Sequence, residues 1–244
     1  MYELKLGGNK MIEIKNLSHT YPDGKVGVKN INLKIEDGDI YGFVGPNGAG
    51  KSTTIKSIVG ILPFTEGQIL VNNIDVVRDS IKAKKLIAYI PDNPDLYDGL
   101  TGAQYLNFIA DVFSVGEERK EIIKKYSELF GIENDLGKLV KAYSHGMRQK
   151  LAIISALVHN PKILIMDEPF VGLDPKATFE VKEILKEMAS EGVTIFFSSH
   201  VLEVVEKLCN KIAIIKNGEI VVNGSVEEIV SNESLEELFM EIAG

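Results

Sequence analysis

Short apolar runs separated by polar, turn-forming residues cover most of this chain, and their spacing predicts alternating strands and helices. The stretch INLKIEDGDIYGFV predicts two strands, 31–36 and 40–44, joined by a turn at 37–39. The runs KILIMD (162–167) and VTIFFSS (193–199) are continuously apolar, and a helical pattern at 176–190 lies between them. Continuous apolar strands that alternate with helices are typical of a parallel sheet covered on both faces. We therefore predict an α/β fold with a mainly parallel sheet.

Two tight turns predict further strand pairs. GQILVNNIDV (67–76) is interrupted by Asn72-Asn73, and KIAIIKNGEIVVNG (211–224) by Asn217-Gly218. Adjacent Asn and Gly residues favour the left-handed conformations that two-residue hairpin turns require. Each stretch is therefore predicted to fold back on itself.

The block from about 86 to 160 has a different pattern. After the strand-like LIAYI it is mostly helical, including GAQYLNFIADVF and RKEIIKKYSELF. We predict an inserted α-helical subdomain here, within a main domain at 11–224. Residues 225–244 are predicted to form an acidic, amphipathic helical tail, and residues 1–10 are interpreted as an N-terminal extension or an alternative start.

Composition narrows the choice of partners and location. The 244 residues are 45% hydrophobic and 25% charged, which is enough to build a globular core. The net charge of −8 argues against a nucleic-acid partner, because such proteins usually present a basic surface. The single cysteine, Cys209, fits a reducing cytosol. No run approaches the roughly 20 apolar residues of a membrane-spanning helix.

A glycine-rich stretch follows the predicted strand 40–44. GPNGAGKST (45–53) matches the P-loop pattern G-x-x-x-x-G-K-[ST], and a helix is predicted from about 51 to 62. Inward-facing backbone N–H groups and the helix N-terminus favour a phosphate at such a loop. Lys51 is predicted to reach the β- and γ-phosphates, and Ser52 to offer a hydroxyl to Mg²⁺. The predicted nucleotide-binding residues of this loop are Gly45, Pro46, Asn47, Gly48, Ala49, Gly50, Lys51, Ser52 and Thr53.

Two acidic residues end the apolar strand at 163–167. Asp167 closes the strand and Glu168 follows it directly. A carboxylate at the C-terminal edge of a buried strand suits a magnesium site beside a P-loop, so Asp167 is the predicted metal ligand. Glu168 is predicted to polarise an attacking water, which makes the predicted reaction hydrolysis.

A histidine ends the strand at 193–199. His200 is predicted to lie at the same sheet edge as the P-loop, and it joins Glu168 and Lys51 as the predicted catalytic residues. A GTPase would be expected to carry N-K-x-D, and the segment NKIA (210–213) lacks the aspartate.

Taken together, these motifs resemble the nucleotide-binding subunit of an ATP-binding cassette (ABC) transporter over about residues 11–224. The order is GPNGAGKST, a helical insert, YSHGM, ILIMDEP, GLDP and SSH. The resemblance implies a P-loop NTPase core with a mainly parallel sheet, an antiparallel β subdomain and an inserted α-helical subdomain. It implies ATP and Mg²⁺ as ligands, and Tyr21 as the aromatic that stacks on adenine. It adds to the nucleotide site Ser144 and Gly146 of the signature segment, and Asp174.

Two positions depart from the family pattern. The signature is usually Leu-Ser-Gly-Gly-Gln, whereas YSHGM keeps only Ser144 and Gly146. The loop after LIAYI usually carries a glutamine that touches the metal and the attacking water, and here it presents Asp92. Asp92 is interpreted as a nucleotide-site residue that binds magnesium through water, with a solvated loop acid as the alternative.

The resemblance also implies partners. The signature of one subunit faces the nucleotide held by another, so a second nucleotide-binding subunit is expected, as a homodimer or a homologous heterodimer. Separate multi-span transmembrane subunits are expected too, which places the chain peripherally on the cytoplasmic face of the cell membrane. Similarity to exporter cassettes favours export, and the alternative is a cytosolic ATPase acting on DNA or ribosomes. Apolar contacts for the membrane partner are predicted in 92–106, at Leu96, Tyr97 and Leu100, and the alternative is that these side chains pack the insert against the core.

Overall fold

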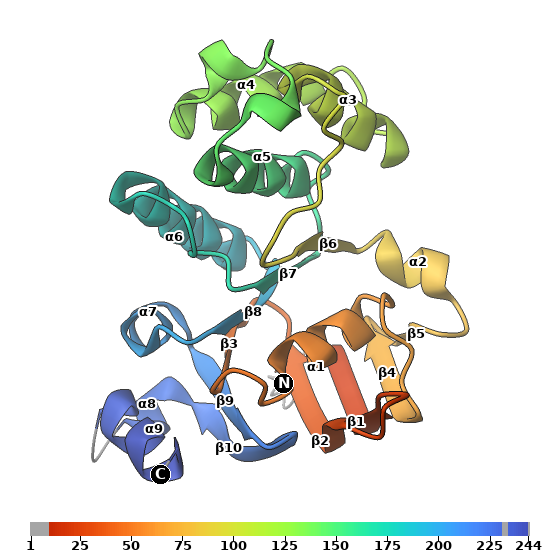
Figure 1. The fold of residues 1–244 in the computed structure, drawn as a ribbon, viewed down its shortest axis with the longest axis vertical. Coiled ribbons are helices and arrows are strands. Elements are labelled where there is room, and N and C mark those ends of the chain that lie inside the picture. The colour runs from red at the N-terminus through yellow and green to blue at the C-terminus, as the bar shows by residue number, and fades with distance from the viewer. Residues whose placement is uncertain (1–9, 231–233, 244) are drawn as a thin grey trace, which may run out of the picture.

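The computed structural model describes residues 10–230 and 234–243, which form two β-sheets with helices packed around them (Figure 1). The strands are β1 (Lys10–Thr20), β2 (Val26–Glu36), β3 (Ile40–Val44), β4 (Glu66–Val71), β5 (Ile74–Asp75), β6 (Ile87–Ile90), β7 (Ile163–Asp167), β8 (Thr194–Ser199), β9 (Lys211–Lys216) and β10 (Glu219–Ser225). The α-helices are α1 (Lys51–Ile58), α2 (Ser80–Lys84), α3 (Gly102–Val112), α4 (Arg119–Leu129), α5 (His145–Leu157), α6 (Pro175–Ser190), α7 (Leu202–Leu208), α8 (Val226–Ile229) and α9 (Leu235–Ala243). Two short 3₁₀ turns, Glu133–Asp135 and Val140–Ala142, connect α4 to α5.

The larger sheet has six strands in the order β10-β9-β3-β8-β7-β6. All neighbouring strands from β9 to β6 run parallel, and only β10 is antiparallel to its neighbour. Both faces of this sheet are covered. On β7, Leu164 and Met166 face a core shared with the helices, whereas Ile163 and Ile165 face a core shared with α1 and the second sheet. The predicted α/β fold with a mainly parallel sheet is therefore confirmed, and burial on both faces explains its continuous apolar strands.

The second sheet is antiparallel, in the order β2-β1-β4-β5. The predicted turn between β4 and β5 is confirmed, with left-handed φ angles of 47° at Asn72 and 62° at Asn73. The predicted strands 31–36 and 40–44 also form, but they lie in different sheets. The turn at Asp37 and Gly38 therefore carries the chain from one sheet to the other, because β3 pairs with β8 and β9 rather than with β2.

A helical layer made of α3, α4 and α5 occupies the top of Figure 1. The helices predicted at 102–113 and 119–130 are confirmed as α3 and α4. The predicted insert starts too early at 86, because β6 pairs with β7 inside the central sheet. The helical part of this block therefore begins at Gly102. The division of the chain into domains stays a prediction.

The other element boundaries follow local chemistry. Helix α1 ends at Ile58, earlier than the predicted 62, and Gly60 follows it with φ of 67°. The hairpin β9-β10 turns at Asn217 and Gly218 as predicted, with φ of 51° and 83°. The tail forms α8 and α9, while 231–233, 244 and most of the extension at 1–10 lie outside the described residues. Within 10–230 and 234–243, no helix combines the length and the apolar character needed to cross a membrane.

Candidate functional site

Three parallel strands end side by side, and the predicted site residues follow them. Val44 at the end of β3 pairs with Ser199 of β8, and Ser198 pairs with Asp167 at the end of β7. The P-loop, His200 and the Asp167-Glu168 pair therefore leave the sheet at one edge. Open parallel sheets bind their ligands at this carboxyl edge.

The P-loop glycines are required by the protein's own backbone. A Cβ atom on Gly45 would lie 2.4 Å from the carbonyl oxygen of Ile215, and one on Gly50 would lie 2.7 Å from that of Gly27. Gly48 has free space around it but needs its left-handed φ of 79°. Gly50 is the N-cap of α1 and has no side chain, so the first N–H groups of the helix are left without a side-chain acceptor. This is the loop and helix geometry that favours a phosphate.

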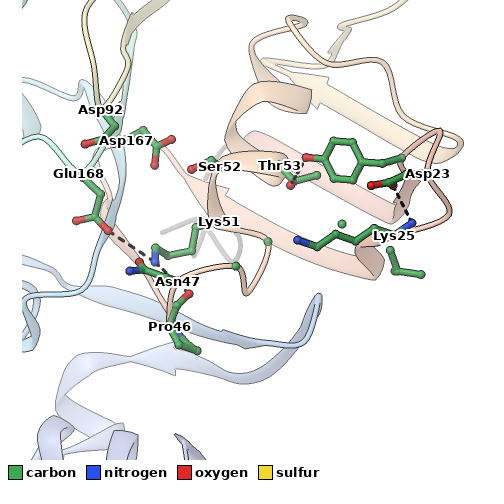
Figure 2. Close-up of a pocket in the computed structure, with 15 residues that line it drawn as sticks. Asp23, Lys25, Pro46, Asn47, Lys51, Ser52, Thr53, Asp92, Asp167 and Glu168 are labelled. Carbon is green, nitrogen blue, oxygen red and sulfur yellow. Dashed lines mark hydrogen bonds and ion pairs between the residues drawn. The ribbon is translucent and has the colours of Figure 1, made fainter.

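A cleft of about 450 Å³ opens over the P-loop. Figure 2 shows the side chains of Asp92, Asp167 and Glu168 on one side of it, and those of Asp23 and Lys25 on the other. The size suits a nucleotide rather than a lone ion. Its lining residues are Tyr21, Asp23, Lys25, Val26, Gly27, Pro46, Asn47, Gly48, Gly50, Lys51, Ser52, Thr53, Asp92, Asp167 and Glu168.

Lys51 is held between the P-loop and the acidic side of the cleft. Its Nζ donates to the carbonyl oxygens of Gly45 at 2.6 Å and Pro46 at 3.4 Å. Glu168 Oε1 lies 3.6 Å from the same nitrogen (Figure 2). The lysine side chain is buried, so its charge is screened less than that of a surface lysine. It therefore presents a fixed positive charge at the P-loop.

Glu168 connects Lys51 to His200. Its Oε2 lies 2.8 Å from His200 Nδ1 and accepts the His200 backbone N–H at 3.3 Å. Its backbone has a left-handed φ of 51°, which is uncommon for a glutamate. The structure thus brings together the three residues predicted as catalytic: Lys51, Glu168 and His200.

The predicted magnesium ligands also lie together. Asp167 is buried at the base of the cleft, and Ser52 and Asp92 line the same side (Figure 2). One hydroxyl and two carboxylates are oxygen donors of the kind that Mg²⁺ prefers. Within the described residues, no cluster of three or more His, Cys, Asp or Glu side chains could hold an ion by itself. This donor set therefore fits an ion that takes its remaining ligands from water and phosphate.

Tyr21 lies at the other end of the cleft. Its hydroxyl is 2.9 Å from Oγ1 of Thr53, which anchors the ring to the start of α1. His19 packs edge-on against the ring, with centroids 4.6 Å apart at 89°. The ring is half-buried and lines the cleft, so its position is compatible with stacking on a planar base.

Six predicted site residues do not line this cleft: Gly45, Ala49, Ser144, Gly146, Asp174 and His200. Ser144 is exposed and caps α5, its Oγ accepting the Met147 N–H at 3.3 Å. Gly146 allows close packing within the chain, because a Cβ there would lie 2.9 Å from the Gly172 carbonyl oxygen. Asp174 caps α6 and pairs with Lys150 at 2.8 Å. The Lys150 ammonium, helped by a backbone N–H, holds the pKa of Asp174 below its ordinary value.

Some cleft residues were not predicted from the sequence. Asp23, Lys25, Val26 and Gly27 line the cleft next to Tyr21, and only their closeness to Tyr21 in the sequence hinted at this. Ser198 does not line the cleft but forms hydrogen bonds with both Asp167 and Glu168, which do. The polar cluster at the end of the apolar run 193–199 was its only sequence signal.

The predicted docking residues differ in exposure. Leu96 is buried in the core and Leu100 is half-buried, so the prediction is wrong for Leu96. Tyr97 is 58% exposed and packs against the rings of Tyr105 and Phe108. The loop therefore offers one accessible aromatic rather than a row of apolar side chains.

Two hollows lie between the core and the helical layer. Their volumes are about 320 and 550 Å³, and both are lined by Lys84, Phe113 and His159. The rings of Phe113 and His159 stack with centroids 3.7 Å apart. Burial lowers the pKa of His159, which favours its neutral form. Ile61, Ile81 and Val112 line one or the other hollow and are largely exposed; these two hollows and their lining are called the apolar groove below.

Comparison with known proteins gives a consistent result. The family described as "ABC transporter" matches residues 28–171. The linearmycin resistance ATP-binding protein LnrL of Bacillus subtilis (strain 168) is 35% identical over 222 residues, which cover 91% of this chain and 71% of LnrL. The chain spans 68% of the length of a second Bacillus subtilis relative and 58% of the length of a relative from Synechocystis.

Solved structures agree with the sequence comparisons. A structure described as the ATP-binding subunit of an ABC transporter superposes with a TM-score of 0.91 at 31% identity, covering 96% of this chain and all of that one. The ATP-binding cassette MJ0796, solved as a post-hydrolysis dimer with ADP and Pi, gives a TM-score of 0.80 at 26% identity over 88% of this chain and 99% of that one.

Proposed function

Because the chain belongs to the ABC transporter family, as an ATP-binding and ATP-hydrolysing transporter subunit, we propose that it powers outward transport through separate membrane-spanning subunits. A resistance protein such as LnrL supports the outward direction, since moving a toxic compound out of the cell confers resistance. The two solved structures described above are an ABC transporter subunit and an ATP-binding cassette, which supports transport over a DNA- or ribosome-directed activity.

The observation that carries the proposed chemistry is the arrangement of Lys51, Asp167 and Glu168 in one cleft. Lys51 and the P-loop N–H groups hold the phosphates of ATP. Glu168 polarises the attacking water, and its contact with His200 Nδ1 orients the carboxylate. Ser52, Asp167 and Asp92 would hold Mg²⁺, which would supply positive charge against the phosphates. Tyr21 stacks on the adenine base.

Asp92→Ala is expected to raise the Mg²⁺ concentration needed for half-maximal ATPase activity by about tenfold, the scale of losing one supporting metal contact. Nucleotide binding without metal should be almost unchanged, because Asp92 is exposed and has no predicted contact with the phosphates. The matched control is Asp95→Ala, in the same loop but outside the cleft. An identical magnesium dependence of the Asp92 variant and the wild type would make Asp92 a solvated loop acid.

A second nucleotide-binding subunit completes the proposed site. Ser144 is exposed at the N-terminus of α5, so it is free to face a phosphate on another chain. The similar cassette MJ0796 was solved as a dimer bound to ADP and Pi, which supports a dimer of such subunits. In the proposed dimer, Gly146 and Asp174 lie beside the same partner nucleotide, and ATP acts as a clamp that hydrolysis opens.

We further propose that a short helix of a membrane-spanning subunit docks in the apolar groove. The groove lies between the core and the helical layer, so a rotation of that layer would move whatever is bound there. Exposed Ile61, Ile81 and Val112 suit the apolar face of such a helix. Lys84 and Lys85 line the apolar groove and suit an acidic side chain on the docking helix. The subunit is thereby held at the cytoplasmic face of the membrane.

Val112→Asp is expected to abolish copurification with a multi-span membrane protein and to abolish transport, because it places a charge in an apolar contact. ATPase activity and melting temperature of the isolated subunit should be unchanged, since Val112 is 59% exposed. The matched control is Val221→Asp on β10, at 48% exposure and outside the groove. Loss of copurification for Tyr97→Asp but not for Val112→Asp would place docking on the loop instead.

A further inference from the structure

One hydroxyl group lies between the two acidic residues of the site. Ser198 is on β8, fully buried, and is the register partner of Asp167 on β7. Its Oγ donates to Asp167 Oδ1 at 2.6 Å. The same oxygen accepts the Glu168 backbone N–H at 3.0 Å. No other side chain among the described residues forms a hydrogen bond with both residues.

The directions of these hydrogen bonds follow from the groups involved. A backbone N–H can only donate, and an ionised carboxylate can only accept. The single hydroxyl proton of Ser198 must therefore point at Asp167, and its lone pair at Glu168. A short hydrogen bond to a charged acceptor is stronger than a neutral one. Ser198 thus holds Oδ1 of Asp167 in place, which leaves Oδ2 without a hydrogen bond among the described residues.

The second hydrogen bond acts on the backbone of Glu168. Its left-handed φ of 51° is costly for a residue with a Cβ atom, and such conformations persist where the surroundings hold them in place. The N–H that Ser198 accepts belongs to this residue. The conformation in turn sets where the side chain points, and it places the carboxylate beside Lys51 and His200.

We infer that Ser198 is a positioning residue for hydrolysis: it orients the metal-facing carboxylate of Asp167 and holds the backbone that aims Glu168. The inference rests on the proposed function of these two acids. It assigns to one side chain the alignment of two groups whose roles differ, since Asp167 serves the metal and Glu168 the attacking water. Removing the hydroxyl therefore disturbs metal binding and hydrolysis together.

The neighbouring serine provides a matched control. Ser199 is the next residue of β8, is also buried, and also accepts a backbone N–H, from Val201 at 3.0 Å. It forms no hydrogen bond with Asp167 or Glu168. Ser198→Ala and Ser199→Ala therefore remove the same group from adjacent buried positions. A purely structural role of Ser198 would make both variants less stable but equally active per folded molecule.

The experiment compares wild type, Ser198→Ala, Ser198→Thr and Ser199→Ala. For Ser198→Ala we expect kcat to fall about 10- to 100-fold, the usual loss for a group that supports a metal ligand. Mn²⁺ affinity, measured by electron paramagnetic resonance with a non-hydrolysable ATP analogue, should fall by a similar factor. ATP binding in EDTA should stay within about twofold of wild type. Ser198→Thr should restore much of kcat, because it keeps the hydroxyl.

A second arm tests whether the effect passes through Glu168. In a Glu168→Gln background, Ser198→Ala should lower the residual rate less than it lowers the wild-type rate, because coupled residues are not additive. Equal kcat and Mn²⁺ affinity for Ser198→Ala and Ser199→Ala would overturn the inference while leaving the proposed function intact. Absence of ATP hydrolysis by the wild-type protein would instead overturn the proposed function.

Discussion

Replacing Glu168 by glutamine is expected to lower ATP hydrolysis by about 10²-fold or more while ATP binding is retained. The amide keeps the shape of the carboxylate and its hydrogen bond from the His200 backbone N–H. It cannot accept a proton from the attacking water, so the chemical step is lost rather than the binding step. The measurement is phosphate release at saturating MgATP, alongside equilibrium binding of ATP. Glu183→Gln, an exposed position on α6, is the control and should hydrolyse ATP normally.

The same variant tests the proposed dimer. Because Glu168→Gln should bind ATP without hydrolysing it, light scattering should show a dimer when MgATP is present. Adding Ser144→Arg places a large side chain at the exposed start of α5 and should return a monomer that still binds nucleotide. A double variant that stays dimeric would mean that α5 does not face a partner's phosphate. Normal hydrolysis by Glu168→Gln would remove Glu168 from the role of general base.

Lys51→Ala is expected to weaken MgATP binding by about 1.5 to 3 kcal/mol, the range for losing a charged hydrogen bond. The variant removes the buried ammonium at the P-loop, which also lies 3.6 Å from Glu168 Oε1. Isothermal titration with a non-hydrolysable ATP analogue measures the change directly.

Lys56→Ala is the matched control for this prediction. Lys56 lies on the same helix, α1, but is exposed and outside the cleft. Its variant should bind nucleotide within about twofold of wild type, as surface substitutions usually do. Unchanged affinity for Lys51→Ala would place the phosphates somewhere other than the P-loop.

Local sequence patterns determined many of the turns and strands of this protein. The glycine spacing of GPNGAGKST requires backbone conformations that the structure confirms at Gly48 and Gly50, and Asn72-Asn73 and Asn217-Gly218 turn where they were predicted to turn. The apolar runs 163–167 and 194–199 form strands buried on both faces. These features are readable from sequence because each depends on neighbours within a few residues. The roles proposed for the site residues remain predictions.

Contacts between residues far apart in the sequence could not be predicted in the same way. The pattern of 31–44 predicted both strands and the turn. It did not predict that the two strands join different sheets. Likewise, the sequence marked Leu96 as an exposed apolar contact, whereas packing against the helical layer buries it. Apolar spacing shows that a side chain is suited to burial, whereas the element that covers it is set by the fold.

The sequence by itself determined which chemical groups are present: a P-loop, two acids at a strand end, and a histidine at another. The tertiary structure decided their neighbours, through the strand order β3-β8-β7-β6 that places β8 between the P-loop strand and the acidic strand. Ser198 and Ser199 show the difference most directly. Both faces of β8 are buried, so no polar and apolar alternation marks which serine faces the acids. Only the register with β7 brings the Ser198 hydroxyl to Asp167 and Glu168, because hydrogen bonds between strands, not local spacing, fix that register.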